Sequence, residues 1–406
     1  MGFGQGVSGL NAAAANLDVI GNNIANSATV GFKQSTAQFA DIYAGTKIGL
    51  GTRVNAVVQS FNQGNVTATN RALDVAITNG NGFFRLTSTD GAVYYSRDGQ
   101  FQRQEDGRVT NMMGMQLTGY PAGVAAGAGV APGPLVISNA QMPPNATQNI
   151  TAKFQLDSGS TPPTVPFDAA NLKSTMFNFS SPMNIYDSLG NKLQVTAYFS
   201  KTAGGPTSPG GTDWTMHVLD INNNELGGSP QTLAFDNNGA LTNAPAVGAA
   251  ALTMPPANGA APISMKMDLT GTTQFGTGND VKQLSQDGYT SGSLLGYSVD
   301  ADGTIRGSYS NEQTQALGQI ALVAFGNVEG LNPEADNLWT ATGASGQPLL
   351  GAPGGSLGTL QSNAVEASNV DLSNQLVNLI VAQRTYQANA QTIKAQDTIM
   401  QTLVNI

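Results

Sequence analysis

The sequence predicts a multidomain α+β protein in which N- and C-terminal helices pair as a coiled coil and two nested, mainly-β domains lie between them. Three observations lead to this fold class. Apolar residues recur at heptad spacing at both ends, the pattern changes to alternation from Arg71 onward, and a Pro/Gly/Ala-rich stretch at 119–135 divides the strand-rich middle. The expected domains are a helical core domain with an extended linker from 1–70 and 364–406, a discontinuous inner β domain from 71–149 and 282–363, and an outer β domain from 150–281.

The N-terminal helix is predicted from apolar residues that step by three and four positions, as in a heptad repeat. Its remaining surface is unusual, because the stretch 16–33 carries asparagines and only one charge, Asp18, before Lys33. Exposed helices commonly carry lysine and glutamate, so this surface favours a helix surrounded by identical neighbours. The candidate self-assembly residues on this helix are Val7, Leu10, Leu17 and Ile24.

The C-terminal helix carries the stronger heptad pattern, and no proline or glycine interrupts it from Asn369 to Ile406. Ser368 stands three residues before Asp371, which is the spacing of a capping box at a helix start. The polar flanks are mostly Gln and Asn, which can be buried against identical neighbours without bringing like charges together. A self-assembling array is therefore favoured, and a single intramolecular coiled-coil stalk remains an alternative. The candidate self-assembly residues on this helix are Leu372, Leu376, Leu379, Tyr386, Ile393, Met400 and Val404.

The middle of the chain reads as short strands separated by tight turns. Leu73, Val75 and Ile77 alternate, and Asp-Gly pairs follow at 90–91 and 98–99 as turn signals. The second block predicts a hairpin around 189–191 and further alternating strands up to about 281. Helices at both ends with strands between them favour nesting, in which the chain leaves each layer and later returns to it.

Composition excludes several functional classes. Charged residues make up 11% of the chain, against about 25% in a typical soluble domain. The net charge of -9 argues against nucleic acid as a partner, since nucleic-acid binding needs a basic face. The absence of cysteine removes thiol catalysis, thiolate metal sites and disulfides. No apolar run reaches the length of a membrane span, so no membrane insertion is expected. The first residues contain no basic residue and no long apolar core, so no cleaved secretory signal peptide is expected.

The sequence offers only weak candidates for catalytic, cofactor-binding or metal-binding sites. Residues 4–9 match G-x-G-x-x-G, but only three residues precede them, so no strand of a dinucleotide-binding unit fits, and glycines before a helix start are the better interpretation. His217 is the single histidine and lies in an alternating strand. Asp300 and Asp302 resemble the opening of a calcium loop but lack its later ligands, so a hairpin turn is expected. We therefore predict no catalytic residue, no cofactor, no metal site and no enzyme.

These residues resemble the bacterial flagellar axial proteins, the family of rod and hook subunits. The asparagine-rich helix that ends in Gly-Phe-Lys at 31–33 is similar to the N-terminal signature of that family. The segments 71–86, 95–101 and 115–122 resemble its inner β domain, and 309–331 and 366–406 resemble its C-terminal half. The resemblance covers roughly half of the chain. The long block from Ile150 to about Val281 favours a hook subunit over a distal-rod subunit.

The resemblance implies a structural protein with terminal helices in the core of a tube and β domains outside. It would polymerise with many copies of itself into a curved, flexible tube, a universal joint that transmits torque from rod to filament. Implied partners are the distal-rod, hook-cap and hook–filament junction proteins and the type III export apparatus. The implied location is the extracellular flagellum. Phe39 and Tyr43 resemble an export-gate motif of rod and hook subunits. The alternatives are a straight distal-rod subunit and a secreted β-rich adhesin with a coiled-coil stalk.

Overall fold

The computed structural model describes residues 3–43, 49–124, 129–202, 211–243, 251–256 and 258–404. Its contacts divide the chain into two compact units. The first unit comprises Met1–Asn139, Leu295–Ser308 and Thr314–Ile406, and the second comprises Ala140–Leu294 and Tyr309–Gln313. The first unit therefore contains both terminal helices. The chain leaves the first unit after Asn139, forms most of the second unit, and returns to the first at Leu295. The predicted division into three domains stays a prediction.

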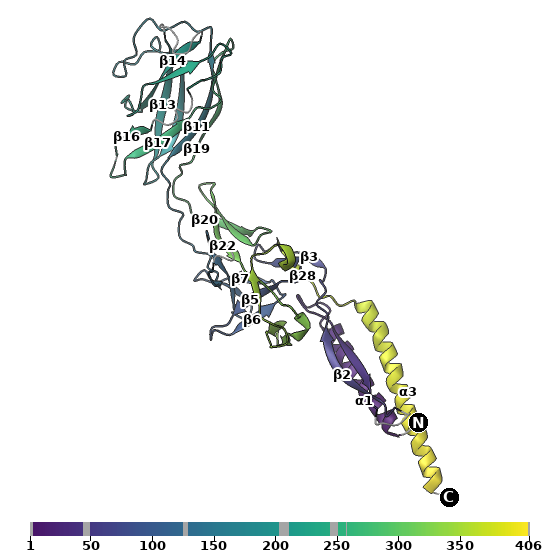
Figure 1. Ribbon diagram of the computed structural model, residues 1–406. Helices are drawn as coiled ribbons and strands as arrows, with labels where there is room; N and C mark the ends of the chain where they lie inside the picture. Colours follow the sequence, from purple (N-terminus) through teal and green to yellow (C-terminus); the bar gives the residue numbers. More distant parts are fainter. Residues whose placement is uncertain are drawn as a thin grey trace. The chain divides into compact units, whose positions relative to one another are not determined.

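Two helices form where the heptad patterns predict them. Helix α1 (Phe3–Ala25) and helix α3 (Leu372–Val404) pack against each other in the first unit, where Figure 1 draws them side by side in purple and yellow. The start of α3 differs from the expectation. Asp371 Oδ1 accepts the backbone N–H of Asn374 at 3.1 Å, so Asp371 is the capping residue. Ser368 lies outside the helix, and its hydroxyl accepts Val370 N instead.

Residues expected to be an extended linker form a hairpin. Strand β1 (Ser35–Asp41) pairs antiparallel with β2 (Thr52–Gln59), with a register shift between Gln38 and Phe39. Both strands also contact α1. Exposed and half-buried positions alternate along most of each strand, because one face lies against the helix and the other faces solvent. The linker interpretation of this segment was wrong, since its alternation specifies a strand pair.

The remaining strands of the first unit form one 13-stranded sheet and two 2-stranded sheets. The path of the large sheet runs β20-β21-β22-β9-β5-β6-β25-β24, and β3 and β4 pair with β28 and β27 of the returning chain. Two 3₁₀ turns, η1 (Val328–Gly330) and η2 (Gly355–Leu357), also belong to this unit. The strands are β3 (Val66–Ala68), β4 (Val75–Thr78), β5 (Phe83–Thr87), β6 (Val93–Ser96), β7 (Phe101–Arg103), β8 (Val109–Asn111), β9 (Gln116–Pro121), β10 (Gly133–Pro134), β20 (Leu294–Val299), β21 (Thr304–Tyr309), β22 (Thr314–Ile320), β23 (Leu322–Ala324), β24 (Asn332–Pro333), β25 (Leu338–Thr340), β26 (Leu349–Gly351), β27 (Thr359–Ser362) and β28 (Ala364–Glu366).

The second unit packs two sheets around one apolar core. One sheet has the order β16-β17-β11-β18, with β19 also paired to β11, and the other has the order β12-β13-β14-β15. The inward residues of both sheets form a single cluster, which includes Phe154, Phe199, Trp214 and Met265, each fully buried. The strands are β11 (Asn149–Asp157), β12 (Phe179–Tyr186), β13 (Lys192–Lys201), β14 (Thr212–Asp220), β15 (Gln231–Phe235), β16 (Leu252–Met254), β17 (Ile263–Asp268), β18 (Thr273–Phe275) and β19 (Asp280–Gln286).

Candidate assembly interface

Small residues bring α1 close to α3. A Cβ placed on Gly6 would lie 2.9 Å from Ile393 Cγ1, and one placed on Gly9 would lie 2.9 Å from Asn389 Oδ1. These glycines lie inside α1, so the interpretation of residues 4–9 as glycines before a helix start was wrong. Their physical role is to let the two helix backbones approach each other.

The buried edge of α1 is displaced by one position from the predicted seam. The buried residues include Gly6, Ala13, Ile20 and Asn23. Gly6 and Asn23 directly precede the candidates Val7 and Ile24, and all four candidates on α1, Val7, Leu10, Leu17 and Ile24, are half-buried. Close approach to α3 occurs at Gly6 and Gly9, whereas the four larger apolar candidates are only half-buried.

Helix α3 buries few of its apolar residues. Gln375 and Ala382, which are seven positions apart, are buried, whereas Leu379 and Ile393 are half-buried. Of the other predicted candidates, Leu372, Leu376, Tyr386 and Met400 are exposed, and the side chain of Val404 lies outside the described residues. We name the exposed apolar side chains of α3 the α3 face; each is 37–61% exposed, and they are Leu372, Leu376, Val377, Ile380, Val381, Tyr386, Ile399 and Met400.

A groove of about 650 Å³ lies between α1, the β1–β2 hairpin and α3. Ala13 and Ile20 line it from α1, Phe39 lines it from β1, and Ala382 and Asn389 line it from α3. Its lining is mainly apolar with amide groups and contains no charged residue among those described. Such a surface suits an uncharged protein segment better than an ionic ligand.

Asn23 attaches α1 to the hairpin. Its side-chain Nδ2 donates to Ser35 O at 2.7 Å, and its Oδ1 accepts Ser35 N at 2.9 Å. The side chain is buried, so both hydrogen bonds are shielded from water. Sequence reasoning counted Asn23 among polar surface residues and missed this contact. Its position in an apolar stripe, one residue before Ile24, was the available signal.

The Gly-Phe-Lys sequence at 31–33 has a clear structural reason. Gly31 has a φ of +72°, and a Cβ there would lie 2.6 Å from Asp98 N. Its own N–H donates to Glu366 O at 2.8 Å. Lys33 Nζ lies 2.6 Å from Glu366 Oε1, and both side chains are fully buried. The segment after α1 is therefore joined directly to the segment before α3.

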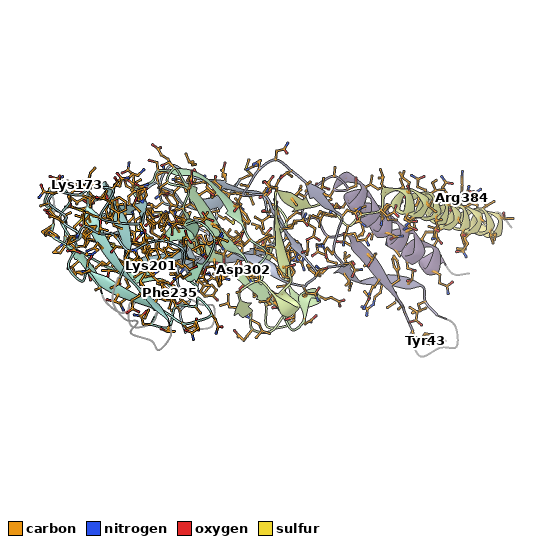
Figure 2. The ribbon with its side chains drawn as sticks, turned by 90° about the horizontal axis from the view of Figure 1, so that it is seen from above. Tyr43, Lys173, Lys201, Phe235, Asp302 and Arg384 are labelled. Carbon is orange, nitrogen blue, oxygen red and sulfur yellow. The ribbon has the colours of Figure 1, made fainter. Side chains whose placement is uncertain are left out.

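The proposed export-gate residues lie on the hairpin. Phe39 belongs to β1 and is 45% exposed, and Tyr43 follows the strand and is 65% exposed. Figure 2 shows Tyr43 on the side of the hairpin away from α3. Phe39 lines the same groove as Val381 of the α3 face, whereas Tyr43 does not line it. Arg384, also labelled in Figure 2, is exposed on α3.

The remaining candidates have structural roles. His217 lies in β14, with its Nδ1 2.7 Å from Glu225 Oε1 and its ring stacked on Phe167 at 3.8 Å. Asp302 Oδ1 accepts Thr304 N in the β20–β21 turn, and Asp300 pairs with Arg306 at 2.8 Å. The described residues contain no group of three or more His, Cys, Asp or Glu arranged to hold a metal ion.

Models of four flagellar domain families match the chain in sequence order. "Flagella basal body rod protein" matches residues 5–33, and "Flagellar hook protein FlgE/F/G D1 domain" matches 76–153. "Flagellar basal body protein FlaE D2 domain" matches 155–289, and "Flagellar basal body rod FlgEFG protein C-terminal" matches 361–406. The matches thus cover both terminal helices and both β-rich regions.

Full-length relatives determine the family. The flagellar hook protein FlgE of Escherichia coli (strain K12) is 48% identical over 413 residues, covering 100% of both chains. The chain belongs to the flagellar hook protein family. FlgE of Salmonella typhimurium is 46% identical over 100% of both chains, and FlgE of Borreliella burgdorferi is 31% identical over 99% of this chain and 98% of its own.

A solved structure supports the fold. The crystal structure of Helicobacter pylori flagellar hook protein FlgE2 aligns with a TM-score of 0.54 at 13% identity, over 74% of this chain and 100% of that one. The predicted family and hook assignment are confirmed, and the distal-rod and adhesin alternatives are set aside. The chain is a structural hook subunit and not an enzyme. No helix in the described part of the chain has the length and apolar character to cross a membrane.

Proposed function

We propose that this hook subunit polymerises through its terminal helices into a curved, flexible tube that transmits torque from the flagellar rod to the filament. The observation that carries this proposal is the α3 face, a set of exposed apolar side chains on a helix with few charges. Exposed apolar patches of this kind mark interaction surfaces. The full-length relatives named as hook proteins are consistent with other copies as the partner.

Within one subunit, we propose that α1 and α3 pair as a coiled coil. Gln375 and Ala382 are buried on α3, and Asn389 lies against Gly9 of α1; these three α3 positions are seven residues apart. Ile393, which contacts Gly6, extends a second row four positions later. A seven-residue repeat of contacts is the pattern expected of a coiled coil.

Between subunits, the α3 face of one copy would fill the groove of the next. Both surfaces are mainly apolar and uncharged, so they can meet without burying an unpaired charge. Val381 belongs to both surfaces, and the other members of the α3 face do not line the groove, so the contact would join two largely different surfaces. Such a contact forms a ring where its rotation closes and an open filament where it does not. We propose that the rotation does not close, so that repetition of the contact generates a helical filament.

The mechanical role requires rigid bodies joined by segments that can adjust. We propose that the helical core domain (1–70 and 364–406), the inner β domain (71–149 and 282–363) and the outer β domain (150–281) are these bodies. Outer-domain contacts between copies would be small and polar, so that they can slide as the bent tube rotates. The low charge of the chain supports such contacts, because few fixed ion pairs oppose sliding.

The same proposal includes the remaining partners and the location. The tube would contact distal-rod, hook-cap and hook–filament junction proteins in the extracellular flagellum. The subunit would leave the cell through the type III export apparatus without a cleaved signal peptide. Exposed Phe39 and Tyr43 support a role as an export-gate motif, since both side chains are accessible on the folded hairpin.

The central test uses two matched double variants of α3. Val377→Asp with Ile380→Asp places charges on the α3 face, whereas Gln383→Asp with Gln387→Asp places the same charges at other exposed positions of α3. Sedimentation and electron microscopy should show tubes for wild type, tubes for the glutamine variant, and no tubes for the apolar variant. Normal polymerisation of the apolar variant would contradict the proposed interface.

The tube geometry and the need for the tails are tested separately. Electron micrographs of the polymer should show curved tubes, and a polymer that is always straight would contradict the role as a flexible joint. A chain lacking residues 1–30 and 369–406 should not form tubes. Ordinary tubes from this truncated chain would contradict assembly through the terminal helices.

A further inference from the structure

Three charged side chains are buried together in the first unit. The side chains of Lys33 and Glu366 are 0% exposed and that of Arg97 is 1% exposed. Lys33 Nζ lies 2.6 Å from Glu366 Oε1, and Arg97 Nη1 lies 3.5 Å from Glu366 Oε2. Burial lowers the pKa of both the Lys33 ammonium and the Arg97 guanidinium, with Glu366 opposing this effect. The cluster therefore has two cations and one anion.

Glu366 is the shared partner of segments that are distant in the sequence. Its Oε1 accepts Lys33 Nζ and also Gly64 N at 2.8 Å. Its backbone oxygen accepts Gly31 N at 2.8 Å. We call residues 31–64 the N-terminal arm and residues 364–369 the C-terminal segment. One glutamate thus joins both ends of the N-terminal arm to the C-terminal segment, and through Arg97 to the β6 end of the large sheet.

The N-terminal arm also packs on the β strands of this unit at a separate place. Phe61 contacts Phe83 and Trp339 edge-to-face, each with ring centroids 5.6 Å apart. Trp339 Nε1 donates to Gln59 Oε1 at 2.8 Å. Docking of the arm therefore brings Lys33 toward Arg97 and buries both charges.

Without Glu366, that docking would bury two cations whose remaining partners are carbonyl oxygens and, for Arg97, the Phe83 ring at 4.9 Å. Lys33 Nζ would keep Asn62 O at 2.8 Å, and Arg97 Nη2 would keep Gly80 O at 3.2 Å. A buried charge that has lost its ionic partner is strongly unfavourable, and two like charges close together add repulsion. Arg97 already has one polar atom, Nε, without a hydrogen-bond partner.

We propose that Glu366 acts as a completion lock, which allows the N-terminal arm to dock only after the C-terminal segment has paired with β3. Glu366 lies opposite Val66 in the β28–β3 pair, so that pairing places its carboxylate between the two cations. The lock couples residues 333 positions apart in the sequence. A subunit whose C-terminal segment is not yet in place keeps its arm undocked and does not present a completed joint between α1 and α3.

The test uses the full-length chain in its monomeric form and the indole N–H signals of its two tryptophans. Trp339 reports docking of the arm through Gln59 and Phe61, and Trp214, in the second unit, is the internal control. Glu366→Gln should speed exchange of the Trp339 indole hydrogen at least tenfold and leave Trp214 unchanged. The matched control is Asp300→Asn, which removes an exposed carboxylate paired with an arginine and should change neither signal.

A rescue variant separates a charge lock from a merely structural glutamate. Lys33→Met combined with Glu366→Gln removes one of the two cations, so at least half of the lost protection at Trp339 should return. The same recovery is expected if Glu366→Gln alone fails to fold. Lys33→Met alone leaves Arg97 and Glu366 as a balanced pair and should keep the arm docked. The lock is refuted if Glu366→Gln leaves Trp339 protected, or if the double variant recovers nothing.

Discussion

The second unit and the α3 helix differ in where their apolar side chains lie. In β17 of the second unit, Met265 and Met267 are 0% and 1% exposed, because the facing sheet covers them. On α3, Val377 and Ile380 are 60% and 51% exposed, and no described element covers them. The second unit has a core of its own, so it is expected to be stable without neighbours.

The terminal helices instead use small and amide side chains within the subunit. Gly6 and Gly9 bring α1 near α3, while Asn23 joins α1 to the hairpin. The large apolar side chains of α3 are left for contacts outside the chain. This difference teaches that folding of the subunit and assembly of the polymer depend on separate sets of residues, and variants of each set test that separation.

The largest effect is expected in the core of the second unit. Trp214 is 0% exposed, and Trp214→Ala should lower the free energy of unfolding of this unit by about 3–5 kcal/mol, because it leaves a cavity. Chemical denaturation followed by circular dichroism measures the change. Ile221→Ala is the control, since Ile221 is 72% exposed, and its effect should be within about 0.5 kcal/mol. Equal losses in the two variants would contradict a self-sufficient core.

A smaller effect is expected where α1 meets the hairpin. Asn23→Ala removes both hydrogen bonds to Ser35 and leaves the half-buried backbone groups of Ser35 without these partners, which should cost about 1–3 kcal/mol. Hydrogen exchange of the Ser35 amide should accelerate, while strands of the second unit keep their protection. Asn11→Ala, at an exposed position of α1, is the matched control. Unchanged exchange at Ser35 would show that the hairpin is held by other contacts.

Substitutions at two glycines distinguish the effect of helix propensity on stability from the effect of close packing. A Cβ on Gly21 meets nothing within 4 Å, so Gly21→Ala should stabilise α1 by about 1 kcal/mol through higher helix propensity. Gly31→Ala should destabilise the same unit, because φ is +72° and the backbone of Asp98 lies in the way. Thermal unfolding followed through Trp339 compares them. The opposite result for either variant would contradict the packing described around it.

Much of this architecture could be predicted from local patterns. The alternation at Ile263, Met265 and Met267 predicts a half-buried strand, and the heptad patterns predict both helices, because in each case the period of burial equals the period of the backbone. The predicted α1 residues Val7 and Leu10 each lie one position after the residues that face α3, Gly6 and Gly9. The prediction followed large apolar residues, whereas close packing selects small ones such as Gly6 and Ala13.

Long-range contacts could not be predicted in this way. Lys33 and Glu366 are 333 positions apart, and nothing in either local pattern specifies the other as a partner. The only signal was that each is a lone charge in a stretch almost free of charge. The hairpin β1–β2 was missed for a different reason, since its polar, Gly- and Thr-rich surroundings were read as a linker although the strands alternate.

The smallest effect concerns Asp98, beside the joint at Gly31. Burial raises the pKa of the Asp98 carboxyl above its usual value of 3.8, the hydrogen bond from Gln100 N opposes this, and Asp74 adds to it. The folded state therefore binds a proton more tightly than the unfolded chain, and stability falls as the pH rises from about 3.8 through the raised pKa. Asp98→Asn does not lose stability in this way as the pH rises, and its side-chain oxygen can still accept the hydrogen bond from Gln100 N. It should have a slightly higher Tm than wild type at pH 7, followed through Trp339, and the difference should vanish below about pH 3.8.

Asp168→Asn provides a control of opposite sign. Hydrogen bonds from Asn171 and from Ala170 N lower the pKa of the Asp168 carboxyl, so its contribution to stability is present at pH 7 and is lost as the pH falls below the usual value of 3.8. Asp168→Asn should therefore lower the Tm of the second unit slightly at pH 7, followed through Trp214. Because Asp168 is an exposed surface residue of the unit with its own core, this effect should be confined to that unit. Shifts of the same sign in the two variants would show that overall charge, rather than local burial, sets the pH dependence of stability.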